Sequence, residues 1–207
     1  LWSVVPLKSG NIEVERGLVA PQQLDQLVNT DRFKITDSGV SSRWLNGTSD
    51  AYYFANGDEH WEDGSITEDG EQAGAMYAKR MRKLETIKAN LPDPVVYGSE
   101  AGAQISFVGW GSSRNTMRDV IAELAKDGVN VNYLHFSYVH PIKTDRLELF
   151  FKENQNIHLI EGNYQGQLGE LIRSKTDLNF MDRLLKFNGR PFFTEDVKEY
   201  IEKNLNS

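Results

Sequence analysis

The fold is decided by two stretches of the same design, Gln104-Ile-Ser-Phe-Val-Gly-Trp-Gly-Ser-Ser113 and Ile157-His-Leu-Ile-Glu-Gly-Asn-Tyr-Gln-Gly-Gln-Leu-Gly169. In each, a short apolar segment enters a glycine-rich turn and continues as a helix-period pattern. This alternation is typical of strand, turn and crossover helix in a parallel α/β sheet. Ligands of such sheets gather at the turns that follow the strands. We therefore expect any site first at the turns of Gly109 and Gly162.

The same alternation continues to the end of the chain. It predicts a three-layer α/β domain over 96–207, with a mostly parallel sheet and helices on both faces. Capping residues and apolar steps predict where each helix begins. The predicted strands are 105–110, 129–138, 157–161 and 184–187, and the predicted helices begin at Ser112 or Ser113, at Thr144 or Asp145, just before Leu168, and at Thr194.

Residues 1–66 lack sustained periodicity. Short strands are expected at 12–16 and 51–55, and one or two helical turns at 21–28. A long helix is predicted from about 68 to 91, where the sequence Leu91-Pro-Asp-Pro94 ends it. We therefore expect 1–95 to be a connector with one long helix, ahead of the 96–207 domain. Residues at three- and four-residue steps predict the apolar stripe of this helix: Ala73, Met76, Tyr77, Met81, Leu84, Ile87 and Leu91.

Composition excludes several classes of protein. A net charge of −7 argues against a nucleic-acid binder, which needs clustered Lys and Arg. An apolar run long enough to span a membrane and a signal peptide are both missing from this sequence, so a cytoplasmic location is expected. The chain contains no cysteine, so it offers no thiolate nucleophile and no cysteine ligand for an iron–sulfur cluster. Because the first residue is Leu1, we expect a piece of a longer chain.

The acidic segment 58–70, which includes His60, raises the question of a metal site. Carboxylates and an imidazole can ligate a divalent cation. The spacing matches neither His-Glu-x-x-His nor a calcium-binding loop. A solvated lead-in to the following helix is therefore favoured, and no metal ligand is predicted.

The turn Gly109-Trp-Gly-Ser-Ser-Arg114 precedes a helix whose free amides can hold an anion. Its spacing is not the Gly-x-Gly-x-x-Gly of dinucleotide-binding proteins, because position 114 is Arg. A tight strand-to-helix turn that needs glycine is the favoured interpretation.

The turn that begins at Glu161 places amide and carboxylate side chains at the carboxyl end of a strand. Asn163 and Gln167 each offer donors and an acceptor to a ligand. The structural alternative is that Asn163 adopts a strained turn conformation and Gln167 caps the next helix. The chemistry of the residues does not choose between these readings. The four histidines show no Ser-His-Asp or Cys-His arrangement.

Five short motifs, in order along residues 30–193, resemble 2-oxoacid:ferredoxin oxidoreductase alpha subunits. Lys34, Ser42 and Trp61 depart from the family pattern, which has Tyr, Pro and Asp there. The motifs are Phe33-Lys-Ile-Thr-Asp-Ser-Gly-Val-Ser-Ser-Arg43, Gly57-Asp-Glu-His-Trp-Glu-Asp-Gly-Ser-Ile-Thr-Glu-Asp69, Lys79-Arg-Met-Arg-Lys-Leu84, Glu161-Gly-Asn-Tyr-Gln-Gly-Gln-Leu168 and Gly189-Arg-Pro-Phe192.

The resemblance implies that 96–207 is a transketolase C-terminal-like domain, and that a pyrimidine-binding domain precedes the connector. It implies an enzyme that oxidatively decarboxylates a 2-oxoacid to an acyl-CoA and reduces ferredoxin. Thiamine diphosphate and magnesium would lie at the interface with a beta subunit, which would carry the iron–sulfur cluster. Ferredoxin and coenzyme A would be met through the complex. The matching residues Arg43, Glu161, Asn163 and Gln167 would serve cofactor binding or the interface.

Two other functions remain open from the residues. The first is a stand-alone α/β domain that binds a nucleotide or other anion at the Gly109 or Gly162 turn. The second is part of a transketolase-type enzyme without electron transfer. As a subunit fragment of the oxidoreductase, the chain alone is expected to be inactive and to bind no cluster, since it has no cysteine and no pyrimidine-binding motif. No catalytic residue is predicted in it.

Overall fold

The computed structural model describes residues 16–206. They divide into two compact units, 16–90 and 91–206. All but the last residue of the strand expected at 12–16 lies outside the described residues. No helix within 16–206 is long and apolar enough to cross a membrane.

The unit of residues 91–206 is built on one five-stranded sheet. Its strand order is β1-β3-β2-β4-β5. Strand β1 runs antiparallel to β3, and every other pair is parallel. The strands are β1 (Val95–Tyr97), β2 (Ile105–Trp110), β3 (Val131–Phe136), β4 (Ile157–Glu161) and β5 (Asp182–Leu185).

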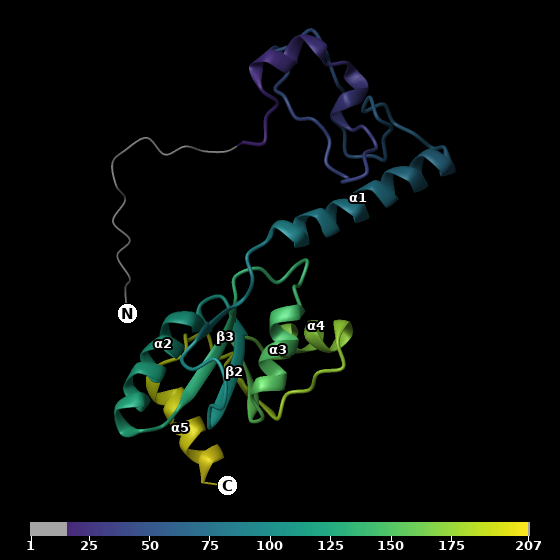
Figure 1. Cartoon of the computed structure of the whole chain (residues 1–207). Helices are drawn as coiled ribbons and strands as arrows, with labels where there is room; N and C mark the ends of the chain where they lie inside the picture. The colour runs from purple at the N-terminus through teal and green to yellow at the C-terminus, as the bar shows by residue number, and fades with distance from the viewer. Residues whose placement is uncertain (1–15, 207) are drawn as a thin grey trace. The chain divides into compact units, whose positions relative to one another are not determined.

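Helices cover both faces of this sheet. Figure 1 shows α2 and α5 on one face and α3 and α4 on the other. The predicted three-layer α/β fold of this region is therefore confirmed. The helices are α2 (Ser113–Leu124), which continues into the short η3 (Ala125–Asp127), α3 (Asp145–Glu153), α4 (Gln167–Lys175) and α5 (Thr194–Leu205).

Successive side chains of the central strands point to opposite faces of the sheet and belong to two separate hydrophobic cores. Phe107 and Ile160 point to the α2 and α5 side, while their neighbours Val108 and Leu159 point to the α3 and α4 side. Strands buried on both faces read as continuous apolar runs, which is why these segments were recognisable in the sequence. The first core also takes Met117, Val120, Val197 and Ile201 from its helices, and the second takes Leu147, Phe150, Leu168 and Ile172.

The order of the strands sets the position of the site. From β2 the chain moves through α2 to β3 on one side, then through α3 back across to β4 on the other side of β2. The direction of winding therefore reverses between β2 and β4. Such a switch point opens a crevice at the carboxyl ends of the two strands. Here those ends are Trp110 and Glu161.

Two details of the sheet differ from the sequence expectation. The antiparallel β1 was not expected; it is three residues long, so its period is too short to detect. The last strand is Asp182–Leu185 rather than 184–187. It lies at the edge of the sheet beside β4, where Asp182 and Arg183 remain exposed to water.

The unit of residues 16–90 has little regular structure besides α1. The strand expected at 51–55 is wrong. The carbonyl of Ala51 accepts from the Trp44 indole (3.1 Å), and the amide of Phe54 donates to Asp63 (3.3 Å), so these backbone groups do not form a ladder. The described helices are η1 (Pro21–Gln26), η2 (Asn29–Arg32) and α1 (Gly70–Asn90).

The buried face of α1 coincides with the predicted stripe only in part, at Met76 and at the half-buried Ala73 and Leu84. Met76 and Lys79 are buried, whereas Tyr77 and Met81 are more than half exposed. The loop before the helix packs on the Lys79 side. Gly39 (φ +72°) lies so close to the helix backbone that a Cβ there would stand 2.4 Å from the Lys83 nitrogen. Contact with this loop, rather than hydrophobicity alone, therefore selects which face of α1 is covered.

Candidate functional sites

The turn after β4 is organised by the buried carboxylate of Glu161. Oε1 accepts from the Trp110 indole (2.9 Å) and from the Asn163 amide (2.7 Å), and both oxygens accept from the Leu168 backbone N–H (3.0 and 2.9 Å). Glu161 is only 1% exposed. Three donors satisfy a charge that would otherwise be costly to bury. The side chain thus links the ends of β2 and β4 to the start of α4.

Asn163 completes the same turn. Its Oδ1 accepts from the N–H groups of Gly166 (2.7 Å) and Gln167 (3.3 Å), which begin α4. Its backbone is not in the left-handed region; that conformation belongs to Gly166 (φ +71°). The polar groups of Glu161 and Asn163 are therefore engaged within the chain.

Gln167 differs from these two residues. Its side chain is exposed and makes no hydrogen bond with any described residue. Nearby, the exposed rings of Tyr164 and Phe187 pack edge to face, with centroids 4.8 Å apart. Gln167 is thus the member of the predicted set in this turn whose side chain is free for a partner.

A chain of hydroxyl groups runs beneath the carboxyl edge of the sheet. Ser113 Oγ donates to the Trp110 carbonyl (2.9 Å), so its 2.9 Å contact with Tyr133 must be donated by the Tyr133 hydroxyl. The Tyr133 oxygen then accepts from Nδ1 of His135 (2.9 Å). Burial, followed by the charge of Arg114, lowers the pKa of His135 to about 4. The imidazole is therefore neutral at pH 7 and carries its proton on Nδ1.

Contacts within the chain account for one feature of each glycine turn. At the start of α4, where an anion would meet free amides, the carboxylate of Glu161 already takes the Leu168 N–H. At β2, a Cβ on Gly109 would lie 2.6 Å from the Ile160 carbonyl. Gly109 is therefore needed for the close approach of β2 and β4, which is the structural reading of that turn.

A second site lies wholly within the unit of residues 16–90. It is a pocket of about 490 Å³ between the 32–43 loop and α1. Its apolar wall includes Phe33 and Met76, and none of its lining residues is Asp or Glu. Five cationic side chains line it: Arg32, Arg43, Lys79, Arg80 and Lys83.

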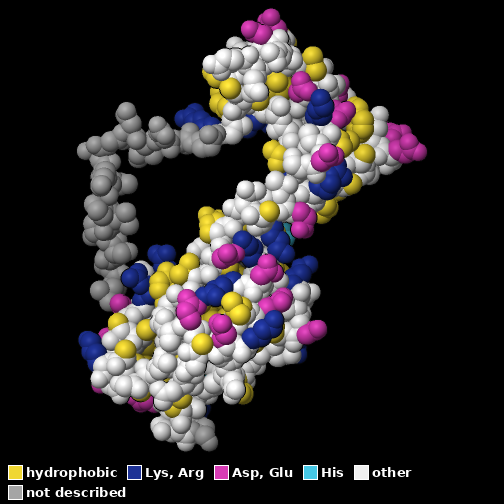
Figure 2. Space-filling view, in the orientation of Figure 1, with side chains coloured by type: hydrophobic (Ala, Val, Ile, Leu, Met, Phe, Trp, Pro, Cys, Tyr) yellow, Lys and Arg dark blue, Asp and Glu magenta, His cyan; other side chains and the backbone are white. Residues whose placement is uncertain are grey.

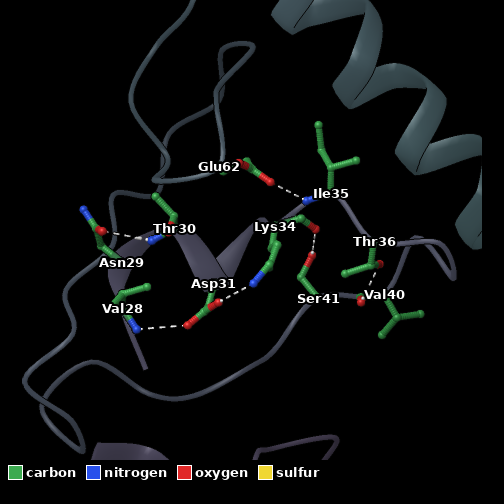
Figure 3. A network of polar contacts seen from close by, with 10 residues as sticks. All are labelled: Val28, Asn29, Thr30, Asp31, Lys34, Ile35, Thr36, Val40, Ser41 and Glu62. Carbon is green, nitrogen blue, oxygen red and sulfur yellow. Dashed lines mark hydrogen bonds and ion pairs between the residues drawn. The ribbon is translucent and has the colours of Figure 1, made fainter. Parts of the chain in front are cut away.

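Local hydrogen bonds hold the loop that forms this pocket (Figure 3). Asp31 accepts from the Val28 N–H (3.0 Å), Ser41 donates to the Lys34 carbonyl (2.9 Å), and Glu62 accepts from the Ile35 N–H (2.6 Å). Arg43, at the end of the loop, donates to the Arg16 carbonyl and keeps an exposed side chain.

The cationic pocket was not predicted from the sequence, although its parts were. The motifs at 33–43, 57–69 and 79–84 supply its loop, His60 and its helical cations. The missed signal is the run Lys79, Arg80 and Lys83, which places three cations on neighbouring turns of one helix.

The acidic segment 58–70 is dispersed rather than gathered. Glu59 forms an ion pair with Arg80, and Asp63 accepts from Ser65. Bonding to Arg80 lowers the pKa of Glu59, and bonding to Ser65 lowers that of Asp63. Within residues 16–206, no three His, Asp or Glu side chains gather in a way that could hold a metal ion.

Comparison with known proteins finds relatives of this sequence. The chain is 31% identical, over 97% of its length, to the 2-oxoacid:ferredoxin oxidoreductase subunit alpha of Saccharolobus solfataricus. This chain is homologous to 2-oxoacid:ferredoxin oxidoreductase alpha subunits. It is also 31% identical, over 98% of its length, to 2-oxoacid:ferredoxin oxidoreductase 1 subunit alpha of Sulfurisphaera tokodaii. No protein-family model matches the sequence.

The homology to these alpha subunits covers only part of them. The chain spans about a third of the length of the curated relatives it matches, 32% in both cases. Its fold is similar to that of 2-oxoglutarate:ferredoxin oxidoreductase from Magnetococcus marinus, whose structure contains 2-oxoglutarate, coenzyme A and succinyl-CoA. The TM-score is 0.75 at 24% identity, and the match covers 84% of this chain and 30% of the other.

Proposed function

We propose that this chain forms part of the alpha subunit of a thiamine diphosphate-dependent 2-oxoacid:ferredoxin oxidoreductase. The enzyme would oxidatively decarboxylate a 2-oxoacid to an acyl-CoA and pass electrons to ferredoxin in the cytoplasm. The observation that carries this proposal is 31% identity along nearly the whole chain. In this proposal residues 1–95 follow a pyrimidine-binding domain, and 96–207 contact the beta subunit.

The exposed aromatic residues of the 91–206 unit support a subunit contact. One of them is the last residue of β2 and three lie on the segments that follow β4 and β5, at the carboxyl end of the sheet. We call these four residues the aromatic edge. Large apolar side chains left in water at one edge are typical of a surface that another protein covers. The aromatic edge consists of Trp110 (42% exposed), Tyr164 (73%), Phe187 (61%) and Phe193 (51%).

Polar groups around the aromatic edge suit the same role. Gln167 offers an exposed amide three residues after Tyr164, and Lys186 lies 4.8 Å from the ring centroid of Phe193. Interfaces commonly combine buried aromatic rings with a polar rim. Figure 2 shows basic and acidic side chains interspersed on the visible face of this unit, so that face carries no single-sign field.

The described residues do not themselves fit a magnesium–diphosphate group. Magnesium prefers carboxylate oxygens beside the phosphates. Within 16–206 no such group of carboxylates is assembled, and the buried carboxylate of Glu161 already accepts from three donors of the chain. The proposal therefore assigns the diphosphate and its magnesium to the beta subunit side of the interface. No step of the chemistry is assigned to a residue of this chain.

Purification of the native complex tests the proposal. The chain is tagged in the cells that make it and isolated without oxygen. We expect a brown, cysteine-rich partner, and reduction of ferredoxin that requires a 2-oxoacid and coenzyme A. A colourless protein that binds a nucleotide alone would support the stand-alone domain. A complex that transfers a ketol group without reducing ferredoxin would support the transketolase-type alternative.

A further inference from the structure

The cationic pocket of the 16–90 unit carries positive charge that the chain itself neutralises only in part. Arg80 is paired with Glu59. Lys79 and Arg43 instead donate to the neutral carbonyls of Phe33 (2.5 Å) and Arg16. A carbonyl satisfies the hydrogen bond without cancelling the charge, and the carboxylate of Glu62 offsets the charge of Lys79 only in part, since the pKa of Lys79 remains lowered. These cations therefore converge in a protein whose net charge is −7.

Two of the cations, Arg32 and Lys79, are in an energetically unfavourable environment. The Nε of Arg32 is buried without a hydrogen-bond partner among the described residues, although its guanidinium lies 4.8 Å from the Phe33 ring centroid. Burial, followed by the charge of Lys83, lowers the pKa of Lys79 to about 8. A buried unsatisfied donor and mutually repelling cations are destabilising unless an anion offsets them.

We propose that this pocket binds a polyvalent phosphate anion, either free pyrophosphate or the phosphate groups of an organic ester. The guanidinium group of arginine can donate two parallel hydrogen bonds to two oxygens of a phosphate, and the lysine ammonium groups add positive charge. The pocket lacks carboxylates, so the anion binds without a bridging metal ion. The inference goes beyond the subunit function, because it concerns the 16–90 unit and needs no partner chain.

The architecture of the pocket supports a preformed site. Gly39 allows the 32–43 loop to approach the α1 backbone, and Arg82 fastens the loop by donating to the Thr36 carbonyl (3.2 Å). Arg43 and Lys83 then stand at the mouth with exposed side chains. A ligand meets these two first, and their replacement does not disturb the packed interior.

The test is a calorimetric titration of the 207-residue chain with sodium pyrophosphate at low salt. We expect saturable one-to-one binding. In the variant that combines Arg43→Gln with Lys83→Gln, the dissociation constant should rise at least about tenfold. The matched control is Lys34→Gln, since Lys34 lies in the same loop, pairs with Asp31 and does not line the pocket. Its effect should stay below about twofold.

Two further titrations distinguish the sources of the anion and expose a false positive. ADP that binds more tightly than pyrophosphate would indicate an organic phosphate, and equal affinity would indicate recognition of the phosphates alone. A glutamate peptide of the same charge should bind at least about tenfold more weakly. Equal binding of that peptide, absence of pyrophosphate binding, or equal losses in the double variant and in Lys34→Gln would each overturn the proposal. None of these outcomes depends on whether the chain assembles into an oxidoreductase.

Discussion

The indole of Trp110 donates to the carboxylate of Glu161 at 2.9 Å, which joins the carboxyl ends of β2 and β4 where the winding of the sheet reverses. The carbonyl of Trp110 also ends the hydrogen-bonded chain that begins at His135. One residue therefore connects the buried polar groups of β3 with the turn before α4. Trp110 is also one of the four residues of the aromatic edge.

Replacement of Trp110 tests that connection. Trp110→Phe removes one donor to a buried carboxylate, and we expect the free energy of unfolding to fall by about 1–2 kcal/mol. Urea denaturation followed by circular dichroism measures the change. Tyr164→Phe is the control, because the Tyr164 side chain is exposed and its ring remains; its effect should stay within about 0.5 kcal/mol. Equal effects of the two changes would show that the indole donor is unimportant.

Substitutions of Asn163 and Gln167 should have different effects, the first on folding and the second on assembly. Asn163→Ala removes the acceptor for the first amides of α4, and should cost about 1–2 kcal/mol of stability. Gln167→Ala removes no contact of the described chain and should change stability by less than about 0.5 kcal/mol. In the proposed complex, Gln167→Ala should instead weaken binding of the beta subunit. If Asn163→Ala left stability unchanged while Gln167→Ala lowered it, the assignment of Asn163 to folding and of Gln167 to the interface would be wrong.

Gly39 provides a steric test of the 16–90 unit. Both Gly39 (φ +72°) and Gly47 (φ +85°) have left-handed backbones, but only Gly39 faces the α1 backbone, while Gly47 has open space. Gly47→Ala should therefore cost about 1–2 kcal/mol from conformation alone. Gly39→Ala adds a clash and should cost about 3 kcal/mol or more. Thermal unfolding of the two variants gives the comparison, and equal melting temperatures would contradict the close packing of loop and helix.

The neutral His135 predicts a loss of stability in acid. Its pKa is about 4 when folded and near its ordinary value of 6.5 when unfolded, so the unfolded chain binds more protons between these values. Stability therefore falls as the pH drops from 6.5 to 4. His135→Asn keeps a donor toward Tyr133 but does not titrate, and should lose less stability across this window. Parallel pH profiles of the two proteins would argue against a buried neutral imidazole.

Lys79 predicts the same rise of stability with pH, but in mild alkali. Its pKa is about 8 when folded, against 10.5 for an ordinary lysine, so the unfolded chain again binds more protons between these values. Stability should rise from pH 8 to 9.5 in the natural protein relative to Lys79→Met. Denaturant midpoints of both proteins across this range measure the difference. A variant that gains as much stability as the natural protein would exclude Lys79 as the titrating group.

Several parts of the fold could be predicted because their causes are local. Strands β2, β3 and β4 are buried on both faces and thus read as apolar runs, and α2 and α5 follow recognisable apolar steps. Their predicted caps were not confirmed, because Ser112 makes no side-chain cap hydrogen bond and the N-cap of α5 is Phe193 rather than Thr194. The turn at Glu161 was recognised by its amides and its position after a strand. What these groups bond to was not predictable, because Trp110 is 51 residues away along the chain.

The sequence by itself determined the alternation of strand, turn and helix, since periodicity and capping act over a few residues. Only the tertiary structure decided which face of α1 is covered, because that depends on the approach of Gly39 to the helix backbone. It also decided that Glu161 is held by three donors, and that cations from a loop and a helix line one pocket. These outcomes depend on contacts between residues far apart in the sequence, which cannot be predicted from local sequence patterns.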